Sequence, residues 1–155
     1  MLSHSAVNHC VENTADFFEK GDMAGQVSLG VLPLFHGFSL AADIHRNIRF
    51  GSQLVMMPRW NPRDAVKLIK RHRVTLMVGV PAMYYSLLRE PGFRGEGISQ
   101  LSYCYTGGDN VNPDLIEQMD VPRPPLKWPM VMLLVGTLTQ VMVRRIMEPP
   151  ACRPM

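Results

Sequence analysis

The sequence predicts an α/β fold with a mostly parallel sheet and helices on both faces, and three observations support this prediction. Helix-like and strand-like segments alternate strictly over residues 3–119, which is typical of βα units. Residues 74–80 are apolar without alternation, as expected of a central parallel strand that is covered on both faces. Glycine or proline occurs within two residues after each predicted strand, where the chain must turn into the next helix.

The first helix and the first strand lead to an aromatic-histidine pair. Residues 3–20 predict a helix, because apolar side chains recur every three or four residues and Ser3 or Ser5 can cap the first turn. Residues 26–35 predict a strand. Because ligands of open α/β sheets bind just beyond the carboxyl ends of strands, Phe35 and His36 are expected at a crevice. The alternative is that His36 only forms a capping or structural hydrogen bond.

The next segment predicts a helix over residues 38–50 and a short strand over residues 53–57. Gly51 suits the end of the helix, and Pro58 stops the strand. The apolar residues of this helix, which we expect to form its core-facing side, are Leu40, Ala41, Ile44 and Ile48.

A third helix begins at Asn61 and Pro62, because asparagine is a good N-cap and proline loses no hydrogen bond in the first turn. Its apolar stripe is followed by the strand of residues 74–80, which Pro81 ends. The dense basic run of this helix, which we interpret as a solvated face, is Lys67, Lys70, Arg71 and Arg73.

The last βα unit comprises a helix over residues 82–89, a strand over residues 101–105, and a turn over residues 106–109. Asn112 and Pro113 then open a helix that reaches about residue 119. Right-handed crossovers place the carboxyl ends of parallel strands along one edge, so the sequence predicts a shared crevice there. The residues expected along it are Phe35, His36, Pro58, Pro81, Gly107 and Gly108.

The composition changes after Asp120, since eight of the 13 prolines lie between Pro113 and Pro154. Proline disfavours both helices and central strands. We therefore divide the chain into a domain over residues 1–120 and a proline-rich, divergent tail over residues 121–155, which we expect to be poorly ordered or produced by a frame change. The apolar stretch at residues 130–143 is shorter than the about 20 residues that a membrane span needs, so no clear span is expected.

The overall composition excludes several classes of function. A net charge of +3 is too small and too scattered to indicate binding to nucleic acid. The three cysteines show no metal-binding spacing, so we expect no metal site and a reducing, cytoplasmic compartment. Residues 1–13 are too polar for a signal peptide. Nothing in the sequence indicates an oligomeric state.

Five pieces of residues 1–119 occur in an order that resembles the AMP-forming acyl-CoA synthetases, the AMP-dependent synthetase and ligase family of the adenylate-forming superfamily. They are Met1-Leu2-Ser3-His4, Leu32-Pro33-Leu34-Phe35-His36-Gly37, Gly51 to Pro58, Val74-Thr75 with Gly79-Val80-Pro81-Ala82-Met83, and Thr106-Gly107-Gly108. The resemblance implies that the fold is an incomplete part of the N-terminal domain of these enzymes.

The resemblance also implies a chemistry, in which a carboxylic acid reacts with ATP and coenzyme A to give acyl-CoA, AMP and pyrophosphate. A small-molecule carboxylic acid, ATP or AMP, and CoA are therefore the expected ligands. By position, the substrate-binding residues would be Phe35, His36, Gly37, Val80 and Pro81. The nucleotide-binding residues would be Thr106, Gly107, Gly108 and Asp109, of which Asp109 departs from the small residue that the family prefers.

Other features of the family are absent from these residues. They contain no Ser/Thr/Gly-rich phosphate loop with its lysine, and residues 136–140 lack the aromatic residue and the magnesium-binding glutamate of the aromatic-Gly-x-Thr-Glu motif. We therefore expect no catalytic residue and no magnesium ligand, and a ligase fragment that is inactive alone. The alternatives are a non-catalytic module that binds nucleotide or acyl-CoA, and a chain that does not fold stably.

Overall fold

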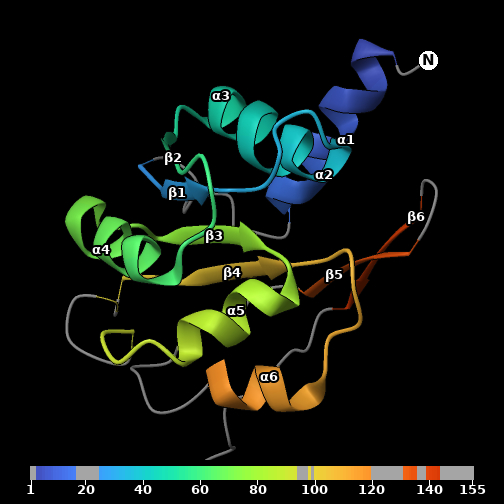
Figure 1. Cartoon of the computed structure of the whole chain (residues 1–155). Helices are drawn as coiled ribbons and strands as arrows, with labels where there is room; N and C mark the ends of the chain where they lie inside the picture. The colour runs from blue at the N-terminus through green and yellow to red at the C-terminus, as the bar shows by residue number, and fades with distance from the viewer. Residues whose placement is uncertain are drawn as a thin grey trace, which may run out of the picture.

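The computed structural model describes residues 3–16, 25–93, 98, 100–119, 131–135 and 139–143. Its centre is a four-stranded sheet in the order β2-β1-β3-β4, in which every pair of neighbours is parallel (Figure 1). The strands are β1 (Val27–Gly30), β2 (Gln53–Met56), β3 (Leu76–Gly79) and β4 (Tyr103–Thr106). The predicted α/β class with a parallel sheet is confirmed.

Helices cover both faces of this sheet. The connection from β1 to β2 crosses in one direction, whereas the connections from β2 to β3 and from β3 to β4 cross in the other. Right-handed crossovers therefore put α2, η1 and α3 on one face and α4 and α5 on the opposite face, as Figure 1 shows. The helices are α1 (His4–Asp16), α2 (Gly37–Ser39), η1 (Leu40–His45), α3 (Arg46–Phe50), α4 (Pro62–His72), α5 (Pro81–Leu88) and α6 (Pro113–Met119).

Each face of the sheet has its own apolar core. On the side of α4 and α5, Leu29 and Met77 pack with Ile69 and Leu87 in the larger cluster. On the opposite side, Leu76, Val78 and Tyr105 pack with Phe38 and Ala42 from α2 and η1. The alternation of side chains along β3, with Met77 facing one cluster and its neighbours facing the other, explains why its sequence is apolar throughout.

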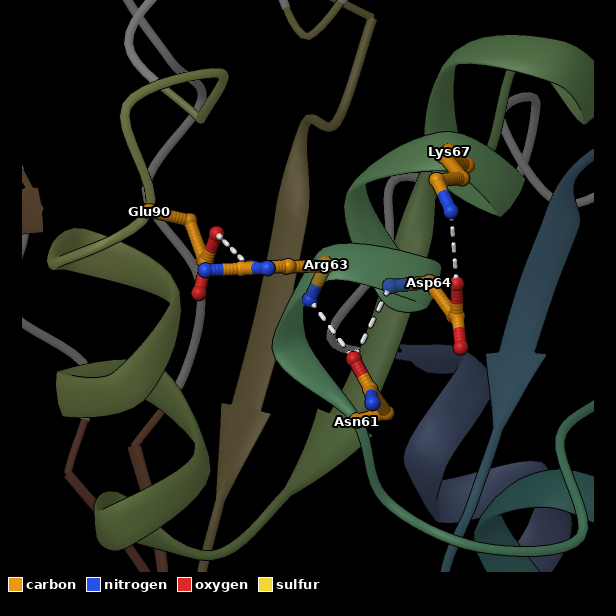
Figure 2. Close-up of polar contacts among 5 residues, drawn as sticks. All are labelled: Asn61, Arg63, Asp64, Lys67 and Glu90. Carbon is orange, nitrogen blue, oxygen red and sulfur yellow. Dashed lines mark hydrogen bonds and ion pairs between the residues drawn. The ribbon is translucent and has the colours of Figure 1, made fainter.

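Helix α4 begins as the sequence predicts. The Asn61 side-chain oxygen accepts hydrogen bonds from the backbone N–H groups of Arg63 and Asp64, at 3.0 and 3.2 Å, and Pro62 occupies the first helical position (Figure 2). The exposed face carries two ion pairs, Lys67 with Asp64 at 2.9 Å and Arg63 with Glu90 at 3.7 Å. The interpretation of this face as solvated is consistent with these exposed contacts.

Helix α1 is also capped as predicted, since the Ser3 hydroxyl oxygen accepts from the Ala6 N–H at 3.1 Å. The helix extends over His4–Asp16. The remainder of the predicted helix, residues 17–20, lies outside the described residues.

The first strand is shorter than predicted. We expected it over residues 26–35, but β1 ends at Gly30, so Phe35 and His36 follow the strand by several residues. The reason is local, because Pro33 has no N–H for a sheet and the chain instead turns, with the His36 N–H donating to the Pro33 carbonyl at 2.9 Å. Of the other strands, β2 ends one residue earlier than expected, and β3 begins two residues later and ends one residue earlier. β4 begins two residues later than expected and ends one residue later, at Thr106, which we expected in a turn.

The helix predicted over residues 38–50 exists, but its predicted core-facing side is wrong. The chain forms α2, a π-helical segment η1, and α3, which ends at Gly51 with a φ of 65° as expected. Ile48 is 76% exposed and Leu40 is 37% exposed, whereas Asp43 and Arg46 are buried. Side chains buried at intervals of four residues follow the wider turn of a π-helix, and the buried Asp43 and Arg46 side chains form hydrogen bonds inside the protein.

The βα alternation ends with α6, and two strands follow in the tail. β5 (Val131–Val135) and β6 (Thr139–Val143) pair antiparallel with each other, and β5 lies close to β4. Residues 120–130, 136–138 and 144–155 lie outside the described residues, so the division of the chain at residue 120 stays a prediction. Within the described part of the chain, no helix combines the length and the hydropathy of a membrane span.

Candidate functional site

The carboxyl ends of the four parallel strands lie at the same edge of the sheet (Figure 1). The chain leaves β1 toward α2 on one face and leaves β3 toward α5 on the other. This reversal between neighbouring strands is the topological switch point, where open α/β sheets bind their ligands. The predicted residues after β1, β3 and β4 therefore share one edge, next to the switch point.

His36 presents a hydrogen-bond donor at this edge. The His36 ring nitrogen Nδ1 accepts a hydrogen bond from the Phe38 N–H at 3.2 Å and so caps α2. The backbone N–H of His36 donates to the Pro33 carbonyl. Because Nδ1 accepts, the neutral ring carries its proton at Nε2. His36 therefore does form the capping hydrogen bond that was the alternative interpretation of this residue. Because His36 is exposed, its Nε2 is still available as a donor. Phe35 beside it is 91% exposed, and Gly37 begins α2.

Val80 and Pro81 form the start of α5, immediately after β3. Val80 is the N-cap residue, half-buried, and it packs with the cluster that contains Phe38 and Tyr105. Pro81 occupies the first helical position and is buried, so its ring fixes the backbone of the turn. Of this pair, Val80 has the partly exposed side chain, whereas Pro81 is buried.

The segment after β4 approaches Val80 closely. Gly108 has a φ of +82°, and a Cβ atom on it would lie 3.8 Å from Val80 Cγ1. Gly107 is buried, and Thr106 is buried with no partner for its Oγ1. Asp109 is exposed and accepts from the Asn110 N–H at 2.7 Å, while Asn112 caps α6 through the Asp114 N–H. Asp109 therefore belongs to the turn and does not cap α6.

A buried polar cluster beneath the loop after β1 was not predicted from the sequence. Ser39 donates to Asp43 Oδ2 at 2.8 Å, and Arg46 donates to the Ala42 carbonyl at 2.9 Å and to Gln26 Oε1 at 3.1 Å. The cluster continues through Arg46 to Ser28 and Asn47. The available signal was the presence of Asp43 and Arg46 between the apolar residues of the predicted helix, to which the sequence analysis assigned no role.

Asp43 is the electrostatic centre of this cluster. It is fully buried, and its Oδ1 has no hydrogen-bond partner. Burial raises the pKa of Asp43 from 3.8 to about 6, while the hydrogen bond from Ser39 and the charge of Arg46 oppose this rise. Burial likewise lowers the pKa of Arg46 and raises the pKa of Tyr105.

The described residues do not fit a magnesium ion. No group of three or more histidine, cysteine, aspartate or glutamate side chains within the described ranges could hold a metal. The segment 136–140, compared above with the magnesium-binding motif, is only partly described, since residues 136–138 lie outside the described ranges.

The family model of the AMP-binding enzymes matches residues 1–125. The chain belongs to this family. The match covers the sheet, its helices and the whole of the edge described above. It confirms the resemblance that the motifs predicted.

Curated relatives are CoA ligases. The chain is 28% identical to a long-chain-fatty-acid–CoA ligase of Bacillus subtilis over 107 residues, which are 69% of this chain and 19% of that protein. It is 34% identical over 91 residues, 59% of this chain and 18% of that protein, to a CoA ligase of Mycobacterium tuberculosis for a methyl-dioxo-octahydroindenyl propanoate. The chain thus spans about a fifth of the length of these relatives.

Solved structures show the same fold. The inhibitor-bound N-terminal domain of FACL13 from Mycobacterium tuberculosis superposes with a TM-score of 0.75 at 21% identity, covering 88% of this chain and 32% of that chain. ATP-bound MatB from Rhodopseudomonas palustris gives 0.74 at 19% identity, covering 86% of this chain and 25% of that chain. The fold is accordingly part of the N-terminal domain of an adenylate-forming enzyme, as predicted.

Proposed function

We propose that these residues form the acyl- and adenine-facing part of the pocket of an AMP-forming acyl-CoA ligase. The observation that carries the proposal is the convergence of the loop before α2, Val80 and Gly108 on one edge of a parallel sheet, beside its switch point. Membership of the family supports the same ligands: a carboxylic acid, ATP or AMP, and CoA.

In this proposal, His36 binds the acyl carboxylate. Its Nε2–H donates to a carboxylate oxygen while Nδ1 stays on the Phe38 N–H, so the ring is oriented before the ligand arrives. The exposed Phe35 ring and the Val80 side chain supply the apolar surface for the acyl group. Gly37 and Pro81 shape the two turns that present these side chains.

The nucleotide is proposed to lie along the turn after β4. Gly108 adopts a φ of +82° and has no side chain, so a flat adenine ring can approach the backbone there. The unpartnered Thr106 hydroxyl and the exposed Asp109 carboxylate offer polar contacts, and Gly107 offers its backbone. CoA would meet the same edge after the acyl-adenylate has formed.

We further propose that the 155 residues alone bind ligands without turnover. Transfer of an adenylyl group needs cations and oriented donors that neutralise the phosphates, and these residues contain neither a lysine-bearing phosphate loop nor the magnesium-binding glutamate motif. This statement concerns the 155 residues and not any longer protein of which they are a part.

Calorimetry with AMP tests the binding half of this proposal. We expect measurable affinity that Gly108→Ala weakens, because the added Cβ strains the turn where the adenine is expected. Gly51→Ala is the matched control, since Gly51 also has a positive φ, of 65°, but precedes β2 at the opposite edge. Equal affinities of both variants, or no binding by a folded chain, would refute the nucleotide site.

Exchange of pyrophosphate into ATP tests the other half. We expect none from the isolated chain with any carboxylic acid. Exchange that is present and is lost in His36→Ala would contradict the proposed inactivity while supporting the assignment of His36. Exchange that survives His36→Ala would count against both assignments.

A further inference from the structure

One hydroxyl group at the base of the candidate site lies between two buried acceptors. Ser39 Oγ lies 2.8 Å from Asp43 Oδ2 and 3.3 Å from the Leu32 carbonyl oxygen. All three residues are buried. Since a serine hydroxyl has a single proton, Ser39 can donate to only one of these acceptors at a time.

The two acceptors belong to opposite sides of the loop that presents His36. Leu32 is the second residue after β1 and leads into the Pro33–His36 turn. Asp43 lies on η1 beyond the loop, and its Oδ2 is 3.7 Å from the position of a Cβ atom on Gly30, the last residue of β1. The acceptor that the Ser39 hydroxyl takes therefore decides whether the Leu32 end of the loop is held to α2. The His36 end is held in either case, because His36 accepts the N–H groups of Phe38 and Leu40.

The protonation state of Asp43 sets this choice. As a carboxylate, Asp43 can only accept, and a charged acceptor at the shorter distance takes the Ser39 proton, so the Leu32 carbonyl receives none from Ser39. When Asp43 takes up a proton from solvent, its own O–H can donate to Ser39 Oγ. The Ser39 proton is then available for the Leu32 carbonyl.

We propose that Asp43 is a positioning residue that acts through the Ser39 hydroxyl, fixing the Leu32 end of the loop over residues 31–36 when Asp43 is protonated and releasing that end when Asp43 is ionised. The effect on the loop is independent of any ligand. Its consequence for binding of an acyl carboxylate by His36 rests on the proposed function.

The surroundings of Asp43 allow this change near neutral pH. Burial brings the pKa of Asp43 to about 6. Burial also raises the pKa of Tyr84 and of Tyr105, so both phenols stay neutral there, and Arg46 stays charged. The charged or titratable side chains described on the elements around Asp43 are Arg46 and Arg49 on α3, His45 on η1, Tyr103, Cys104 and Tyr105 on β4, Tyr84 and Tyr85 on α5, and His4, His9, Cys10 and Glu12 on α1. Glu12 is paired with Arg49 at 2.6 Å.

Carbon-13 NMR of the full chain tests the proposal directly. The Leu32 carbonyl and the Asp43 carboxyl carbon are followed between about pH 4.5 and 7.5, where an aspartate shifted in this way titrates. We expect both resonances to change with one midpoint. The protection factor of the His36 amide, which donates to Pro33, is expected to fall about fivefold above that midpoint once the intrinsic rise of amide exchange with pH is divided out, the effect of one net hydrogen bond.

Two variants separate the proposal from a general effect of pH. In Asp43→Asn the amide nitrogen donates permanently to Ser39, so the Leu32 carbonyl at the upper pH is expected to match the wild-type carbonyl at the lower pH. In Ser39→Ala the Leu32 carbonyl is expected not to titrate. His36→Gln and His45→Gln remove the imidazoles of the loop and of η1, and Asp64→Asn neutralises an exposed carboxylate on α4. None of these three control variants is expected to abolish the Leu32 titration.

A Leu32 carbonyl that stays constant while Asp43 titrates would overturn the proposal. A Leu32 titration that persists in Ser39→Ala would also overturn the proposal. So would a Leu32 titration that disappears in His36→Gln or in His45→Gln. Because no ligand is present in these measurements, the result does not depend on the proposed function. If AMP and carboxylic acids then fail to bind, the proposed function fails and the positioning of the loop by Asp43 stands.

Discussion

At the scale of single residues, the buried carboxylate of Asp43 affects the stability of the whole chain. Its pKa is raised from 3.8 to about 6, so between these values the native state binds a proton that the unfolded state lacks. The free energy of unfolding should therefore fall as the pH rises from about 4 to about 6, and stay level above that range.

Asp43→Asn should remove this pH dependence. At neutral pH the variant should be more stable than the wild type by up to about 3 kcal/mol, the free energy that corresponds to the pKa shift. Urea unfolding at several pH values measures the difference. The free energy of unfolding of the wild type, relative to that of Asp43→Asn, should fall between about pH 4 and 6. A rise of this difference over the same range would contradict the raised pKa of Asp43.

Gly108 and Gly37 test how the backbone shapes the candidate site. Gly108 has a φ of +82°, where a Cβ atom is strained, whereas a Cβ on Gly37 would meet nothing within 4 Å and Gly37 has no positive φ. We expect Gly108→Ala to lower the free energy of unfolding by about 1 kcal/mol and Gly37→Ala to have no such effect. Thermal unfolding of both variants measures this, and equal losses would contradict the turn described here.

At the scale of elements, α4 shows what the sequence can predict. Its start at Asn61, its apolar stripe and its exposed basic face are local features, and all are found in the structure. Asn61→Ala should cost about 1 kcal/mol, because two helix N–H groups lose their acceptor, and Asn61→Asp should restore most of it. Equal unfolding midpoints for Asn61→Ala and wild type would show that the cap contributes nothing.

The region from α2 to α3 shows what the sequence could not predict. Hydrophobicity alone places Ile48 inside, but the structure buries Asp43 and Arg46 on the opposite side. Ser39 forms a hydrogen bond with Asp43, and Gln26 and Ser28 from outside the helix accept hydrogen bonds from Arg46. These partners come from distant parts of the sequence, so no local pattern reveals them. The turn at Pro33 and His36, which shortens β1, differs in that its cause is local, because Pro33 has no N–H to donate to a neighbouring strand.

Ile48 provides the test of this corrected helix face. Since its side chain is 76% exposed, Ile48→Ala should change the free energy of unfolding by less than about 0.5 kcal/mol. Ile69 on α4 is fully buried, and Ile69→Ala should cost about 2–5 kcal/mol. A comparable loss in both variants, measured by chemical denaturation, would restore the face predicted from the sequence.

At the scale of the whole molecule, the parallel sheet brings together residues that are far apart in the chain. The sequence predicted this edge because alternating βα units fix the direction of every strand, and the four parallel pairings confirm it. The roles of the residues along the edge stay predictions, because alternation and motifs locate a crevice without showing which atoms contact a ligand. The neighbouring ribbon of β5 and β6 was not predicted, because that segment has no clear alternation.

The measurement that tests the central claim most directly is a titration of the isotope-labelled chain with a sulfamoyl analogue of an acyl-adenylate, followed by backbone amide NMR. We predict that the perturbed amides fall in three separate segments at the carboxyl edge of the sheet, residues 31–37, 80–82 and 106–109. Perturbations at the exposed face of α4 or at the amino edge of the sheet instead, in a chain that remains folded, would contradict the proposed site.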